Sequence, residues 1–212
     1  MCIRDRKKSS AKHVTWNIFI KFYMNIYIII SVIFAFITPI IGITSIFRWE
    51  YKPQRMTRFL VLVLAGVFLV SLFIQDAGVG FYLATVQFIW ASIYFGLSFK
   101  YWMGWTSSLD ISVLIGVILL GIVWYLTNNP LIALVMSMII YVIAFSPTFI
   151  KTWHYPYTES WLFYGCDVAA ALISLVALWN IFILNALFPC FVLFLNLTMV
   201  MIIVLGRKLN IK

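Results

Sequence analysis

Long, nearly uncharged apolar runs recur along the chain, and they are the feature that most limits its fold. They fill residues 22–47, 57–74, 81–99, 109–126, 131–150, 161–179 and 184–205. A helix needs about 20 apolar residues to cross the hydrocarbon core of a bilayer, which is about 30 Å thick. Only 10% of the residues are charged, whereas a soluble domain carries about a quarter. The sequence therefore predicts a membrane protein with seven transmembrane segments.

The breaks between these segments are short and rich in turn-forming residues. They read QDAGVG at 75–80, MGWTSS at 103–108 and TNNP at 127–130, and the weakest break lies near Asn180. The strands of a membrane barrel would instead alternate in units of about ten residues, and no such alternation runs through the segments. The predicted fold class is all-α.

Basic residues gather at alternate breaks and predict an orientation. If the loops after the first, third and fifth segments share one side with the C-terminus, that side holds Arg48, Lys52, Arg55, Arg58, Lys100, Lys151, Arg207, Lys208 and Lys212. The three opposite loops hold none. The positive-inside rule then places the C-terminus in the cytoplasm and the N-terminus outside the cytoplasmic (inner) membrane. Four lysines before residue 22 favour the opposite orientation. We give more weight to the loops, because all the basic loops lie on the same predicted side.

The beginning of the chain predicts a retained helix and not a cleaved signal. The first apolar stretch is far longer than the 7–15 residues of a signal-peptide core. The opening MCIRDR, residues 1–6, resembles a translated sequencing-adaptor sequence and carries no weight in the structural prediction.

Charge and cysteine usage exclude other classes of protein. The net charge of +9 arises from residues that flank apolar segments, so nucleic acid is not an expected partner. Cys2, Cys166 and Cys190 are odd in number, and two lie inside apolar runs. We interpret them as small packing residues and not as a disulfide framework.

Two stretches of the sequence share one pattern of residues. AFITPIIGITSIFRWEYKPQR contains Thr38-Pro39, and IAFSPTFIKTWHYPYTES contains Ser146-Pro147. Each hydroxyl–proline pair interrupts an apolar run, which then closes on aromatic and basic residues and a second proline. The two stretches lie 108 residues apart.

A second pair of residues has almost the same spacing, which predicts an internal repeat. Gln87 precedes Asn196 by 109 residues. The first three segments therefore correspond to the last three, and a single linking helix makes the two triplets parallel. The predicted organisation is a tail at 1–21, a three-helix repeat at 22–99, a linker helix with its loops at 100–130, a second repeat at 131–206 and a basic tail at 207–212.

This plan of three, one and three helices resembles the PQ-loop superfamily, which includes the SWEET sugar transporters, and it is similar to that of nicotinamide riboside transporters. The matching residues are Pro53-Gln54, the two hydroxyl–proline pairs and the Gln87/Asn196 pair. The Pro53-Gln54 pair falls in a predicted loop, which departs from the SWEET pattern. Over residues 22–207 the chain looks most like a family of bacterial seven-helix proteins without an assigned function.

The resemblance implies an integral membrane transporter that moves a small polar solute by alternating access. In the SWEETs an asparagine from each triplet contacts the substrate, and Gln87 and Asn196 occupy the matching positions here. The solute would be sugar-, nucleoside- or vitamin-like, moved by facilitated diffusion or with proton coupling. The alternative is a non-transporting receptor or assembly partner, whose basic loop at 48–58 would bind a protein or anionic lipid.

Small and polar residues form a stripe on four of the predicted helices. The stripes are Ser31, Ala35, Thr38, Gly42 and Ser45; Ala84, Gln87, Ala91 and Tyr94; Ser137, Tyr141, Ala144 and Thr148; and Asn185, Pro189 and Asn196. Such stripes allow close helix packing and interhelical hydrogen bonds. Four of them on repeat-related helices also fit the lining of one central cavity.

Asp167 is the most telling single residue, because it lies about six residues inside an apolar segment. An aspartate there costs about 2.5–3.5 kcal/mol on insertion scales, and its short side chain cannot reach the interface. It must contact water or a partner, or be protonated. Lys151, His154 and Tyr164 are candidate partners, and both a functional role and a structural hydrogen bond remain open.

The predicted solute-binding residues are accordingly Gln87, Asn196, Tyr141 and Asp167. Three prolines, Pro39, Pro147 and Pro189, are predicted to bend their helices, either as hinges or as static kinks. The chain has no phosphate-binding glycine loop and no HExxH motif, and its two histidines lack a ligand cluster. We therefore expect no enzyme activity, metal or cofactor. The expected partners are membrane lipids and a small solute, with homo-oligomerisation left open.

Overall fold

The computed structural model describes residues 3–48, 55–101, 108–178 and 183–209, and these residues fold into helices without a strand. The helices are α1 (Ile3–Phe47), α2 (Arg55–Ile74), α3 (Gly78–Tyr101), α4 (Ser108–Thr127), α5 (Pro130–His154), the 3-10 helix η1 (Pro156–Thr158), α6 (Trp161–Val176) and α7 (Ile183–Leu209). The predicted all-α class is confirmed. Each predicted apolar segment corresponds to one α-helix.

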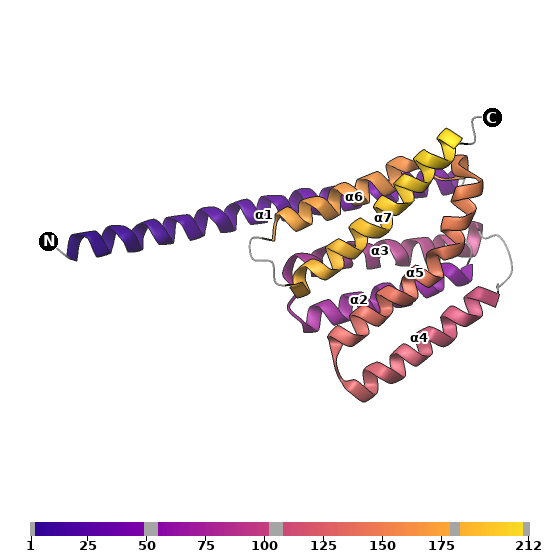
Figure 1. The fold of residues 1–212 in the computed structure, drawn as a ribbon, viewed down its shortest axis with the longest axis horizontal. Coiled ribbons are helices and arrows are strands. Elements are labelled where there is room, and N and C mark those ends of the chain that lie inside the picture. Colours follow the sequence, from indigo (N-terminus) through magenta and orange to yellow (C-terminus); the bar gives the residue numbers. More distant parts are fainter. Residues whose placement is uncertain (1–2, 49–54, 102–107, 179–182, 210–212) are drawn as a thin grey trace.

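The first helix is much longer than its apolar segment. It begins at Ile3, and its N-terminal half extends beyond the bundle formed by the other helices (Figure 1). Residues 3–24 contain neither glycine nor proline, so no residue in this stretch interrupts the helical hydrogen-bond ladder. The part of α1 that is apolar enough to cross a membrane is Asn25–Phe47.

Helix ends follow the predicted turn chemistry. Asp76 and Asn128 both adopt a left-handed backbone with φ of 49°, a conformation that aspartate and asparagine tolerate better than most residues. The Asn129 side-chain oxygen accepts hydrogen bonds from the backbone N–H groups of Leu131 and Ile132, at 3.0 and 3.4 Å. Asn129 therefore caps α5, with Pro130 in the first helical position where proline is favoured.

Three helices are long and apolar enough to cross a membrane, and a fourth qualifies if the bent α5 counts as one span. The three are the Asn25–Phe47 part of α1, most of α3 and most of α7. The apolar stretches described for α2, α4 and α6 have 16 or 17 residues, although α2 and α4 are each 20 residues long, or about 30 Å at 1.5 Å per residue. Helix α6, with 16 residues, falls short of a hydrocarbon core about 30 Å thick.

The helices alternate in direction, so α1, α3, α5 and α7 end at the same end of the bundle (Figure 1). Helix α1 packs against α3 and α6, while α2 packs against α3, α4 and α5. Helix α7 packs against α3, α5 and α6. Helix α4 lies on the outside of the bundle against α5 and α2.

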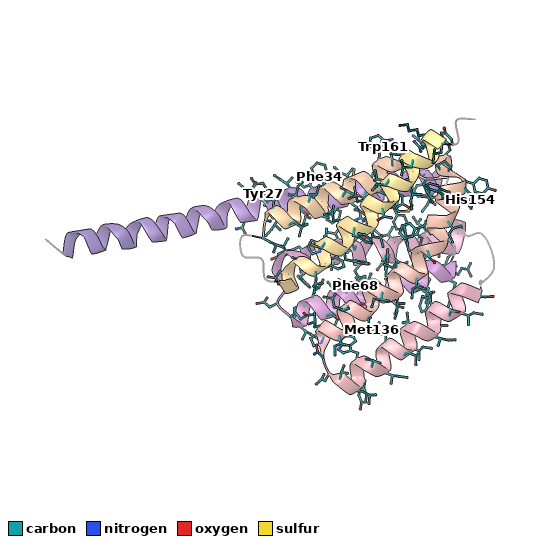
Figure 2. All side chains as sticks on the ribbon, viewed as in Figure 1. Tyr27, Phe34, Phe68, Met136, His154 and Trp161 are labelled. Atoms are coloured by element: carbon teal, nitrogen blue, oxygen red, sulfur yellow. The ribbon has the colours of Figure 1, made fainter. Side chains whose placement is uncertain are left out.

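The centre of the bundle is aromatic. Phe68 of α2 lies inside the bundle (Figure 2), 5.3 Å from the ring centroid of Phe188, 5.7 Å from that of Phe191 and 6.0 Å from that of Tyr141. The outward faces are apolar as well, and α4 exposes Ile111, Ile115, Ile118, Leu119 and Ile122. A soluble monomer rarely exposes such a continuous apolar surface, which agrees with a membrane protein.

Candidate functional site

The seam between α1 and α6 carries a row of small and polar side chains. The Ser31 hydroxyl donates a hydrogen bond to the Ala170 carbonyl oxygen at 2.8 Å and lies 2.6 Å from the Ser174 hydroxyl. Ala35 and Ala170 are both fully buried in the same cluster. Small residues spaced by four positions allow two helices to approach closely, so this seam positions the groups that follow along it.

Seven residues after Ser31 in α1 and seven residues before Ser174 in the antiparallel α6, the same register brings Thr38 to Asp167. Asp167 is 7% exposed and Thr38 is 3% exposed. The Thr38 hydroxyl and the Gln87 side-chain amide, which comes from α3, both interact with the Asp167 carboxyl. Thr38 Oγ1 is buried without a hydrogen bond of good geometry, so its interaction with Asp167 is a close polar approach and not a well-formed bond.

Tyr94 lies beside this group and connects three helices. Its hydroxyl donates to the Pro39 carbonyl oxygen of α1 at 3.3 Å. The guanidinium carbon of Arg58, from α2, lies 5.0 Å from the centroid of the Tyr94 ring, within the range of a cation–π interaction. Gly42 of α1 leaves the room that the Tyr94 hydroxyl and the Phe163 ring occupy, because a Cβ at this position would overlap both.

Tyr141 of α5, a predicted solute-binding residue, stands in the aromatic centre. Its ring stacks on Phe145 with centroids 5.8 Å apart and meets Phe191 edge-on at the same distance. Both Asp167 and Arg58 are close enough to exert an electrostatic effect on Tyr141 and on Tyr94. Tyr141 therefore belongs to the neighbourhood of the Asp167 cluster without a direct hydrogen bond to it.

Asn196 of α7 is not part of the cluster. It is buried, and its side-chain amide donates to the Val192 carbonyl oxygen of its own helix at 2.8 Å. The structure therefore brings Gln87 and Asp167 together, places Tyr141 near them and gives Asn196 a hydrogen bond within α7.

Two of the three candidate partners of Asp167, Tyr164 and His154, do not interact with it. The Tyr164 hydroxyl donates to Glu159 Oε2 at 3.2 Å, away from Asp167. His154 is exposed at the end of α5 (Figure 2). The Lys151 side chain lies outside the described part of the structure. The observed partners, Thr38 and Gln87, belong to the predicted polar stripes.

The predicted prolines behave in two ways. Helix α5 bends by 41° between Pro130–Ser146 and Thr148–His154, at the position of Pro147. Helices α1 and α7 run through Pro39 and Pro189 as single elements. The hinge role of all three remains a prediction.

Sequence reasoning missed Arg58 as a member of the site, because it was counted among the basic residues of a loop. Helix α2 begins at Arg55, so Arg58 lies in its first turn and reaches over Tyr94. Long basic side chains commonly lay their stems along apolar surface in this way. The sequence signal that could have identified it is its position three residues after Arg55, where α2 begins, within the first turn of the helix.

The two described cysteines are free thiols, and Cys190 is exposed on α7. Its interpretation as a packing residue is therefore wrong.

No known family model, no curated protein and no solved structure matches this chain. The residues of the site and the arrangement of the helices thus carry the functional argument.

Proposed function

We propose that this chain is a membrane transporter of a small polar solute, formed by two three-helix units around a shared polar path. Asp167, Gln87 and Thr38 would form the centre of that path. The observation that carries the proposal is the convergence of these polar side chains from α6, α3 and α1 inside an otherwise apolar bundle. Intramembrane ionisable residues commonly mark substrate or ion pathways.

The helix contacts support the arrangement of three, one and three helices. In the first unit α3 contacts both α1 and α2, and in the second α7 contacts both α5 and α6. Between the units, α1 meets α6, α5 meets α2, and α3 meets α7. These pairs are unchanged when each helix is exchanged for its counterpart in the other unit, and the one departure within the two units is a small contact between α3 and α6 that α7 and α2 do not repeat. An internal repeat with an axis between α3 and α7 would produce this symmetry.

The polar cluster straddles the boundary between the proposed units. Thr38 and Gln87 come from the first unit and Asp167 comes from the second. A solute held at this boundary would contact both units, and a rocking motion of one against the other would change its surroundings. Transporters with internal repeats commonly bind substrate at such an interface near the bilayer midplane.

The short helix α6, with 16 residues, fits the same proposal. A bilayer accommodates apolar stretches a few ångströms too short by local thinning and by snorkelling of flanking residues, at a modest cost. The basic residues Arg48, Arg55 and Lys100 lie at one end of the bundle together with Arg207 and Lys208. We propose that this end faces the cytoplasm.

The test is uptake of radiolabelled sugars, nucleosides, vitamins and amino acids into liposomes that contain the purified full-length protein. We expect at least one solute class to enter faster than into empty liposomes. Gln87→Ala should reduce that uptake at least tenfold, because it removes an amide from the cluster. Gln75→Ala is the matched control, because Gln75 donates to Ser71 at the far end of α2. Equal uptake by the two variants would contradict the proposed path.

A receptor or assembly role makes a different prediction for the basic end. In that case Arg55→Gln and Lys100→Gln should abolish function while Gln87→Ala leaves it intact. Arg58 cannot separate the two roles, because its guanidinium lies over Tyr94 within the site.

A further inference from the structure

We infer that Asp167, Thr38 and Gln87 form a binding site for a monovalent cationic group. The group is either an alkali-metal ion or the protonated amine of a solute. Binding itself is argued from the residues below. Its use in moving a solute rests on the proposed transport function.

Asp167 has no counter-ion among the described residues. No lysine, arginine or histidine forms an ion pair with it, and its interacting side chains are the neutral Thr38 and Gln87. The charged or titratable groups nearby are Cys166 on its own helix, Tyr94 on α3, Tyr141 on α5 and Arg58 on α2, whose guanidinium lies over the Tyr94 ring and does not pair with Asp167. A buried carboxylate without a counter-ion is disfavoured in an apolar interior. A bound cation would remove that penalty.

Thr38 supplies the independent sign of a ligand. Its Oγ1 is shielded from solvent and has no hydrogen bond of good geometry. Several other hydroxyls in the bundle donate to their own helix, as Thr85 does to the Phe81 carbonyl at 2.8 Å and Ser137 does to the Ala133 carbonyl at 2.7 Å. Ser71 Oγ of α2 also lacks a partner, but Thr38 is the one of the two that lies at the Asp167 carboxyl. Burying a hydroxyl without a partner costs about 1–3 kcal/mol. The Thr38 oxygen is available to a ligand at the Asp167 carboxyl.

The surrounding groups are rich in oxygen. Gln87 can turn its amide oxygen toward a cation or its NH₂ toward a bare carboxylate. Pro39 lacks an N–H, so the carbonyl oxygen of Ala35, one turn before it, loses its regular helical donor. Ala35 lies on the same buried stripe of α1 as Thr38. Carboxylate, hydroxyl and carbonyl oxygens are the donors that hard cations and ammonium groups prefer.

The charge of the site selects a monovalent ligand. Asp167 provides a single negative charge, which one positive charge neutralises. A divalent ion would leave a net positive charge buried near Arg58, whose guanidinium also reaches this neighbourhood. Uncompensated buried charge is disfavoured whatever its sign.

The experiment measures thermal unfolding of the detergent-purified full chain at constant ionic strength. Choline chloride, which carries no N–H donor and is bulky, is replaced stepwise by sodium, potassium or methylammonium chloride. We expect at least one of these cations to raise Tm in proportion to the logarithm of its concentration, because a ligand bound to the native state stabilises it. An effect of sodium or potassium points to a metal ion, and an effect of methylammonium alone points to an amine.

Three variants make the result specific. Asp167→Asn should abolish the cation-dependent rise in Tm. Thr38→Val should move the rise to at least tenfold higher concentration, whereas Thr85→Val, which removes a hydroxyl already bonded to its own helix, should leave it unchanged. If Asp167→Asn does not fold, the comparison of the two threonine variants decides. An unchanged rise in Asp167→Asn or Thr38→Val, or no effect of any cation on the native sequence, overturns the site.

Uptake measured in parallel separates this inference from the proposed function. Cation-dependent stabilisation without uptake of any solute retains the cation site and rejects transport. Uptake by the native chain that proceeds equally in choline, together with no cation-dependent rise in Tm, retains transport and rejects the cation site.

Discussion

The Tyr94 hydroxyl donates a hydrogen bond to the Pro39 carbonyl oxygen across 3.3 Å, joining α3 to α1 one residue beyond Thr38. The proline that interrupts the α1 ladder thus gains a tertiary contact at the point where the chain also approaches Asp167. The same tyrosine ring supports the Arg58 guanidinium. One side chain therefore couples the conformation of α1 to the charged groups around it.

Removing the Tyr94 hydroxyl should weaken this connection. We expect Tyr94→Phe to lower the free energy of unfolding by about 0.5–1.5 kcal/mol, the usual net value of one hydrogen bond. Tyr94→Leu should lower it further, by about 0.5–2 kcal/mol, because Arg58 then also loses its aromatic partner. Denaturant titration in a mild detergent measures both. Equal stabilities of the Phe and Leu variants would show that the ring contact with Arg58 contributes nothing.

The packing at Gly42 gives a second prediction. A Cβ on Gly42 would overlap the Tyr94 hydroxyl and come within 2.8 Å of the Phe163 ring. We expect Gly42→Ala to destabilise the protein by about 1–3 kcal/mol through overpacking. Gly121→Ala is the matched control, because no heavy atom lies within 4 Å of a Cβ there. It should be neutral or stabilising by up to about 1 kcal/mol, since alanine favours the helix.

Thermal unfolding of the two alanine variants against the native chain decides the point. A Gly42→Ala variant as stable as Gly121→Ala would mean that α1, α3 and α6 are not packed as closely as the structure indicates.

Arg207 closes the end of the bundle at which α7 finishes. Its Nε donates to the Pro156 carbonyl at 3.2 Å and its Nη2 to the Glu159 carbonyl at 2.9 Å. Arg207→Lys should cost about 1–2 kcal/mol, because an ammonium group cannot reproduce the planar pair of donors. The α5–α6 connection should also become more sensitive to limited proteolysis. Lys208→Gln, at the exposed neighbouring position, should leave both stability and cleavage unchanged, and a matching loss there would contradict a specific role for Arg207.

Much of the fold follows from the sequence because apolar length and turn chemistry are local signals. Each predicted segment became a helix, and the breaks at 75–80 and 127–130 contain the left-handed Asp76 and Asn128. The long N-terminal part of α1 was not predicted, because the helices were predicted from the length of apolar runs. A polar helix gives no such signal. The predicted length of α6 was too long. The apolar run at 161–179 continues past the end of the helix at Val176, and the helix has 16 residues.

The site was predictable in its composition but not in its pairing. The polar stripes correctly marked Thr38 and Tyr94 as buried and the half-buried Gln87 as facing Asp167, because helical spacing alone fixes the face. The register of α1 against α6, which decides that Asp167 contacts Thr38, depends on packing between residues more than 100 positions apart. Asn196 was predicted to join the site and does not, because a buried amide can form its hydrogen bond within its own helix.

The orientation of the bundle gives the last prediction. Tyr157, in η1, is 68% exposed at the basic end, and Tyr125, near the end of α4, is 87% exposed at the opposite end. In a background with Cys2, Cys166 and Cys190 replaced by serine, Tyr125→Cys and Tyr157→Cys each provide one accessible thiol. A membrane-impermeant maleimide added to intact cells should label Tyr125→Cys and spare Tyr157→Cys, because the positive-inside rule places the basic end in the cytoplasm. Both variants should be labelled once the cells are opened. Labelling of Tyr157→Cys alone in intact cells would reverse the orientation and make the N-terminal lysines the deciding charges.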